Sequence, residues 1–253
     1  MVLISGRLKA YKSAIRALPS SRRLTPTDLL TPDFLMEQSG PIQMYYAPHN
    51  EYLNASASVV ITGITPGWTQ MRAAYESAAA SLAEGLGDEE VCMKSKKAAS
   101  FAGPMRNNLI NMLDELGLQT ALKLPTCREL FGQERTRLHT TSLLRFPVFV
   151  HGKNYTGASP ALLSHALLRN RGLGFIREEL ALLDQKALII PLGKAVEQAM
   201  RAAQKEGWLE GRHILWGFPH PSGANGHRVS QFRANFEQMR AAVHGLFRSP
   251  YHR

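Results

Sequence analysis

Four short apolar segments constrain the fold of this chain more than any other feature. They are rich in apolar and β-branched residues and lie at 57–63, 140–149, 187–193 and 213–216. Runs of this kind are typical of buried β-strands, and the stretches between them are long enough for helices. Strands that alternate with helices favour a parallel sheet. We therefore predict a three-layer α/β/α fold with a central, mostly parallel four-stranded sheet.

The segments between these strands predict helices. Apolar residues recur at helical spacing, most clearly in 101–118 and 229–247. The full set of expected helices is 69–86, 101–118, 160–183, 194–205 and 229–247, with a break in the third near Gly172 and Gly174. Residues 1–50 predict a helical lead-in followed by irregular chain. We expect them to form an N-terminal extension packed on a main domain of residues 51–253.

An excess of basic residues points to a polyanionic partner. The 253 residues include 30 Lys and Arg against 20 Asp and Glu, a formal net charge of +10. Phosphate contacts made by Lys and Arg release counterions and dominate the non-specific affinity of proteins for DNA. Charge alone favours DNA binding no more than it favours a protein that is simply basic, so the partner has to be inferred from motifs.

Other features exclude several classes of protein. No run approaches the roughly 18 apolar residues of a membrane span, and residues 1–23 lack the continuous apolar stretch of a secretory signal. Cys92 and Cys127 are too few for a disulfide framework or a four-cysteine metal site. The histidines follow no recognised metal-ligand spacing. We expect a cytoplasmic monomer without a metal or other cofactor.

Two loops at expected strand ends carry residues suited to ligand binding. Parallel sheets bind ligands at the carboxyl ends of their strands. After the first strand, residues 63–68 form a rigid turn with Gly and Pro that lets a ligand approach the backbone. After the fourth, His220 stands between Pro219 and Pro221, which fixes an imidazole able to stabilise an anion. Taken alone, each loop is also an ordinary feature of α/β proteins.

Taken together, the loops resemble the motifs of a known family. Gly-Ile-Thr-Pro-Gly at 63–67 resembles the first motif of the uracil-DNA glycosylase superfamily, close to the Gly-Ile-Asn-Pro-Gly of its mismatch-specific branch. His-Pro-Ser at 220–222 resembles the opening of its last motif. Ser-Phe-Ala-Gly at 100–103 is similar to the Pro-Phe-Val-Gly of the iron–sulfur branch, and 187–195 to its strand ending Leu-Gly-x-x-Ala. The motifs keep the family's order over about 59–243.

The resemblance implies an enzyme that cleaves the N-glycosidic bond of a base flipped out of DNA. His220 would stabilise the departing base, and Phe101 would stack on it beside Ile64. The residues implied to bind DNA are Gly67, Ser222, Asn225, His227 and Arg228. Of these, His227 or Arg228 would be the wedge pushed into the duplex. The alternatives are a core position for Phe101 and a helix-capping or solvated side chain for Arg228.

The chain departs from the family at two places in the site. Thr65 stands where relatives carry the Asn or Asp that positions the attacking water, and a hydroxyl orients water but supplies no charge. Thr141 or Ser142 stands where an Asn reads the edge of uracil, and a hydroxyl lacks the fixed donor and acceptor of an amide. The four cysteines of the iron–sulfur branch are also missing, so no cluster is expected.

These departures leave two functions open. The first is release of a base from DNA, and the altered pocket favours a modified pyrimidine over uracil. A substituted cytosine from phage DNA would make the role defence instead of repair. The second is a catalytically inactive DNA-binding protein that kept the fold. Thr65 favours the second function, whereas His220 and Phe101 favour the first.

Overall fold

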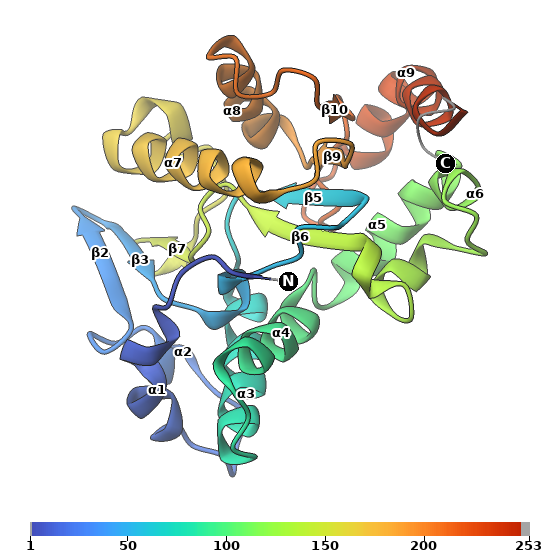
Figure 1. Ribbon diagram of the computed structural model, residues 1–253. Helices are drawn as coiled ribbons and strands as arrows, with labels where there is room; N and C mark the ends of the chain where they lie inside the picture. The colour runs from blue at the N-terminus through green and yellow to red at the C-terminus, as the bar shows by residue number, and fades with distance from the viewer. Residues whose placement is uncertain (1, 249–253) are drawn as a thin grey trace.

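A parallel four-stranded sheet forms the centre of the computed structural model, which describes residues 2–248 (Figure 1). Its strand order is β10-β9-β5-β6, and each neighbouring pair is parallel. The strands are β5 (Val59–Gly63), β6 (Leu138–Ser142), β9 (Leu188–Pro191) and β10 (His213–Ile214). The predicted sheet is confirmed. Because the strands are parallel, the loops that follow their carboxyl ends meet at one edge.

Helices cover both faces of this sheet, which gives the three predicted layers. Alternate residues of a strand point to opposite faces. Val60 belongs to a core cluster with α7 and α8, whereas Ile61 belongs to a cluster with α5 and α9. Both faces are therefore buried, which explains why β5 and β9 are mostly apolar, although the equally buried β6 carries polar residues from His139 to Ser142. The helices are α3 (Trp68–Ala83), α4 (Asp88–Ala99), α5 (Pro104–Glu115), α6 (Leu118–Ala121), α7 (Ala166–Leu182), α8 (Lys194–Lys205) and α9 (Arg228–Arg248).

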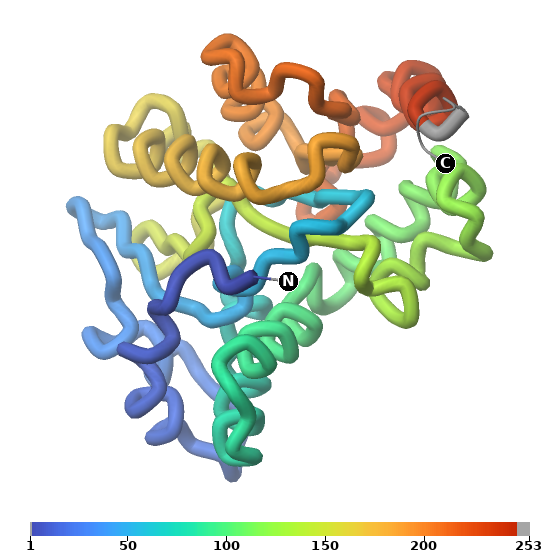
Figure 2. Tube along the Cα trace, viewed as in Figure 1, coloured from blue at the N-terminus to red at the C-terminus, as the bar shows by residue number. Residues whose placement is uncertain are grey.

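The first 50 residues add helices and a β-hairpin to the same core. The expected irregular chain after the lead-in is wrong, because residues up to Tyr45 form a hairpin that turns at Gly40 and continues into a second, antiparallel sheet. Buried Ile42 and Met44 alternate with the more exposed Gln43, a signal of a strand. The elements of this segment are β1 (Val2–Leu3), α1 (Leu8–Arg16), α2 (Pro26–Leu29), β2 (Leu35–Ser39), β3 (Ile42–Tyr45) and η1 (Pro48–Glu51). The strands β4 (Tyr52–Leu53), β7 (Val148–Val150) and β8 (Lys153–Asn154) complete the two sheets to which β1, β2 and β3 belong. Figure 2 shows this blue segment beside α3, on which α1 packs. The domain division at residue 50 stays a prediction.

The segment at 140–149 is two strands, not the single strand expected. β6 ends at Ser142, and the chain resumes as β7 in the antiparallel sheet. Pro147 lies just before β7 and has no N–H to donate to a ladder, so it marks the change of sheet. The five residues between the two strands leave the carboxyl edge of the central sheet.

The expected break in the helix at 160–183 is also wrong. The helix α7 begins at Ala166 and runs through Gly172 and Gly174 without interruption. The helix buries Leu168, Ile176 and Leu180 on either side of these glycines, and this packing keeps it continuous. Tertiary packing thus outweighs the weak helix propensity of glycine.

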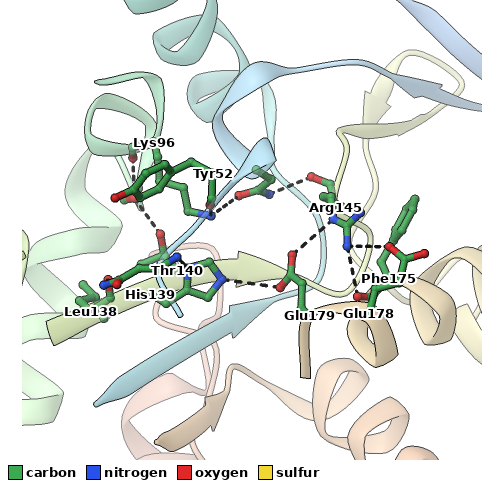
Figure 3. Close-up of polar contacts among 12 residues, drawn as sticks. Tyr52, Lys96, Leu138, His139, Thr140, Arg145, Phe175, Glu178 and Glu179 are labelled. Carbon is green, nitrogen blue, oxygen red and sulfur yellow. Dashed lines mark hydrogen bonds and ion pairs between the residues drawn. The ribbon is translucent and has the colours of Figure 1, made fainter. Parts of the chain in front are cut away.

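A buried ion pair joins α7 to the chain that follows β6. The side chains of Arg145 and Glu179 are 4% and 2% exposed, and Arg145 Nε lies 3.4 Å from Glu179 Oε1. On the other side of the carboxylate, His139 Nε2 of β6 lies 3.7 Å from Glu179 Oε2 (Figure 3). Although burial opposes ionisation, the contacts with His139 and Arg145 lower the pKa of Glu179 to about 2. The charged carboxylate therefore balances the buried Arg145 cation.

His139 lies beside this network as a neutral ring. Burial lowers the pKa of His139 to about 4, so the ring carries no charge near neutral pH. The backbone N–H of Asn54 donates to His139 Nδ1 over 3.4 Å. The single ring proton is then on Nε2, where it faces the Glu179 carboxylate.

A second buried cation, Lys96 of α4, is joined to Arg145 through Asn50. Lys96 Nζ donates to Asn50 Oδ1 and to the Tyr52 carbonyl, each over 3.1 Å. Asn50 Nδ2 donates to the carbonyl of Arg145 over 2.8 Å. Burial, opposed by the Glu179 charge, lowers the pKa of Lys96 to about 7. These contacts fix α4, η1 and the chain after β6 relative to one another.

Glu179→Gln should destabilise the protein by about 3 kcal/mol, because it leaves the buried Arg145 cation without its buried counterion. Glu178→Gln is the matched control. Glu178 also pairs with Arg145, at 3.1 Å, but its side chain is 60% exposed, so its loss should cost less than about 1 kcal/mol. Urea unfolding of both variants measures the difference, and equal losses would show that the buried pair does not stabilise the fold.

The stability of the wild type should rise with pH above neutrality, and Lys96→Met should abolish this rise. The pKa of Lys96 is about 7 in the folded protein and 10.5 in an unperturbed lysine. Between these values the unfolded chain binds the proton more tightly, so the free energy of unfolding of the wild type should increase with pH. The slope should approach about 1.4 kcal/mol per pH unit.

Urea unfolding of wild type and Lys96→Met across this pH range measures the slope. The slope is the readout, because the variant also loses the hydrogen bonds of Lys96 and its absolute stability will differ. Parallel pH profiles of the two proteins would contradict a buried Lys96 with a lowered pKa.

Candidate active site

A cavity of about 60 Å³ lies at the carboxyl edge of the central sheet, between the loop after β5, the end of β6, the segment after α4 and the loop after β10. We call it the central cavity. It brings together all the residues predicted to be catalytic or base-binding, which are Ile64, Thr65, Phe101, Thr141, Ser142 and His220. A larger cavity of about 630 Å³, between β10 and α9, contains none of them. Convergence of the motifs, not size, identifies the site.

His220 is held firmly in the wall of the central cavity. Gly193, after β9, has a φ of +83° and approaches so closely that a Cβ atom there would lie 3.1 Å from His220 Cβ. A glycine is therefore needed at this position. The Ser222 N–H donates to His220 Nδ1 over 3.3 Å. Burial lowers the pKa of His220, so the ring is neutral and its proton is on Nε2.

Phe101 lines the cavity in a strained backbone conformation. Its φ of +49° is rare for a residue with a large side chain. The preceding residue, Ser100, is fixed at two groups. Arg106 donates to its carbonyl through Nε over 3.0 Å and through Nη2 over 2.5 Å, and Arg135 donates to its hydroxyl over 2.6 Å. Strain of about 1–3 kcal/mol clusters at functional sites, which favours a specific role for this ring. Phe101 also packs in the core cluster of α5, as its alternative interpretation expected.

The Thr65 hydroxyl is largely occupied by the backbone between β6 and β7. It donates to the Phe146 carbonyl over 3.0 Å and accepts from the Val148 N–H over 3.0 Å. A hydroxyl has one proton and two lone pairs. One lone pair therefore stays available, with which Thr65 can orient a water molecule but cannot take up its charge.

Thr141 and Ser142 end β6 beside the strand that leads into the first motif. Thr141 is in register with Thr62, and Ser142 with Gly63. Thr141 is 3% exposed, and its Oγ1 has no hydrogen-bond partner within residues 2–248. Buried polar atoms in this state are uncommon in folded proteins, so each needs an explanation.

His49 and Asn50 are among the residues that line the central cavity although the motifs did not identify them. They lie on η1, within the segment expected to be an extension. His49 is 5% exposed, and its Nδ1 finds no hydrogen-bond partner in the described part of the chain. Burial, together with the Lys96 charge, lowers the pKa of His49 to about 3, so the ring is neutral. The available signal was a polar His-Asn-Glu run among the mostly apolar residues of 44–53.

The residues predicted to bind DNA lie on the loop after His220 and at the start of α3, where Gly67 is the N-cap. Ser222 supports His220 through its N–H. Arg228 Nη1 donates to the carbonyls of Pro221 and Ser222 over 3.3 and 3.1 Å, and Asn225 Nδ2 donates to the His220 carbonyl over 3.2 Å. Arg228 and Asn225 therefore brace the loop, whereas His227 is exposed. Contact of these residues with DNA stays a prediction.

Residues 2–248 contain no group of three or more His, Cys, Asp or Glu side chains placed to hold a metal ion. Across that range, none of the helices combines the length and the apolar character that crossing a membrane requires. Cys92 and Cys127 are buried and not joined to each other.

Comparisons with known proteins agree with this geometry. The uracil DNA glycosylase superfamily, as a family model, matches residues 51–244. The uncharacterized protein YoxB of Bacillus subtilis (strain 168) is 45% identical over 243 residues, which cover 96% of this chain and 94% of that protein. The family match includes the four motifs and the whole central sheet. This chain belongs to the uracil-DNA glycosylase superfamily.

Proposed function

We propose that this protein hydrolyses the N-glycosidic bond of a base that is flipped out of DNA into the central cavity. Membership of the superfamily supports a glycosylase-type hydrolase that acts on DNA. The observation that carries the proposal is the meeting of Phe101, His220 and Thr65 in one cavity at the carboxyl edge of the sheet. A stacking ring, a fixed N–H donor and a group that orients water together suit the release of a flipped base.

In the proposed reaction, the bond between C1′ of the deoxyribose and the base breaks, and its electron pair stays on the base. The sugar becomes an oxocarbenium ion, a water molecule adds to C1′, and the water proton passes to the departed base or to solvent. The Nε2–H of neutral His220 donates to the base oxygen on which negative charge develops. A preorganised donor in a buried site stabilises such charge more strongly than bulk water does.

Thr65 limits how much help the protein gives to the attacking water. Among the described residues that line the central cavity there is no Asp or Glu, so the oxocarbenium charge is balanced mainly by the departing base. The reaction therefore requires a base that leaves readily as an anion. We favour a modified pyrimidine over uracil, because Thr141 and Ser142 stand where relatives carry a fixed amide. Release of uracil would serve DNA repair, and release of a base found in phage DNA would serve defence.

The second candidate function is DNA binding without chemistry, and Thr65 is the observation that favours it. Two features of the site argue against DNA binding without chemistry. The close approach of Gly193 serves to seat His220, and the strained turn at Phe101 costs folding free energy. A protein that only bound DNA would need neither feature.

His220→Ala should slow base release about a hundredfold to a thousandfold, because it removes the donor that stabilises the departing base. Binding of the same DNA should stay nearly unchanged. The assay is alkaline cleavage at abasic sites in oligonucleotides that carry one deoxyuridine, 5-hydroxymethyl-deoxyuridine or 5-hydroxymethyl-deoxycytidine. His165→Ala is the control, since His165 lies outside the central cavity. Absence of abasic sites with the wild-type protein on every substrate would favour the binding-only function.

A further inference from the structure

Two residues that line the central cavity, His49 and Thr141, each carry a buried polar atom, Nδ1 and Oγ1, with no hydrogen-bond partner among residues 2–248. We call them the open atoms. Their residues are 5% and 3% exposed and come from different parts of the chain, η1 and β6. Leaving one buried polar atom without a partner lowers stability about fivefold to a hundredfold in the folding equilibrium. Two such atoms on residues that line one small cavity point to a ligand that supplies the missing partners.

The position of His49 is fixed by its neighbour. The Asn50 side chain is held from two sides, by the carbonyl of Arg145 at 2.8 Å and by Lys96 Nζ at 3.1 Å. Arg145 is in turn paired with buried Glu179. The network that stabilises the fold thus also holds η1 against the end of β6. His49 therefore lines the cavity on a rigid support, as residues that bind a ligand selectively do.

We propose that His49 and Thr141 together read the polar edge of the flipped base, with His49 supplying the second group that a β6 amide supplies in relatives. This inference rests on the proposed function. A neutral imidazole offers one donor and one acceptor, and a hydroxyl offers both. The edge of a pyrimidine presents a donor next to an acceptor, so it can satisfy both open atoms at once. The lowered pKa of His49 keeps the ring in the neutral form that this match requires.

Removal of an open atom should affect the stability and the activity of the protein in opposite ways. A polar group that only supports the fold lowers stability when it is removed. An open atom has no partner in the folded protein, so replacing it with an apolar group should leave stability unchanged or raise it. If the atom reads the base, the same replacement should lower the rate of base release.

Thr141→Val tests whether stability is kept while base release is lost, and Thr62→Val is a closely matched control. Thr62 is the register partner of Thr141 on β5. Its Oγ1 is likewise buried without a partner in the described chain, but Thr62 does not line the central cavity. Both variants should unfold at the same or a higher urea concentration than the wild type. Only Thr141→Val should lose base release, by about tenfold to a hundredfold on the best substrate of the oligonucleotide panel.

His49 is tested by removal and by rescue. His49→Phe keeps a flat ring without nitrogen atoms and should lose a similar factor in base release, with DNA binding retained. His49→Asn places an amide group near the position of Nδ1 and should recover part of the lost rate. A structural role for His49 would instead make the activity of the variants follow their stability.

The outcomes separate the inference from the function on which it rests. If the wild type releases no base from any substrate of the panel, the proposed function fails and the inference fails with it. If the wild type releases base but Thr141→Val and His49→Phe are as active as Thr62→Val, the function stands and the inference is overturned. Loss of activity in both variants at full stability, with partial rescue by His49→Asn, supports the inference.

Discussion

The buried pairing of Arg145 with Glu179 is the interaction on which the site depends most. The Arg145 side chain binds α7 through Glu179, while its backbone carbonyl accepts a hydrogen bond from Asn50. Asn50 in turn binds Lys96 of α4. One residue after β6 therefore fixes the helix above the sheet and the turn η1 beside it. Removing charge from such a network is costly because the remaining ion cannot regain its hydration.

The central cavity is built at a cost in stability. Phe101 is held in a left-handed conformation, and the open atoms of His49 and Thr141 are buried without partners in the described chain. Each of these features opposes folding and would be removed by selection for stability alone. They lie around one cavity together with His220, whose ring is fixed by the close approach of Gly193. In a preorganised site of this kind, the residues are already in position before the base binds. The free energy needed to hold them there lowers the stability of the fold instead of the affinity for the base.

Much of the fold could be predicted from the sequence, and part of the site could not. Local patterns were sufficient for β5, β9 and α8, because these two buried strands are mostly apolar and the helix has a clear period, whereas β6 and β7 were predicted as one strand. The short motifs also singled out His220 and Phe101, which the fold brings together in one cavity. The hairpin at β2 and β3 was missed because its apolar alternation is short. His49 and Asn50 were missed because their positions depend on a contact 95 residues away in the sequence, which no local pattern records.

The claim that the central cavity holds a flipped base is tested most directly by a crystal structure with DNA. The DNA should carry the nucleotide that the protein cleaves, with fluorine at C2′ to destabilise the oxocarbenium ion and prevent release. The base is expected inside the cavity, stacked on Phe101, with His49 Nδ1 and Thr141 Oγ1 within hydrogen-bond distance of its edge and His220 Nε2 facing a base oxygen. DNA bound to the protein with its base outside this cavity would contradict the claim.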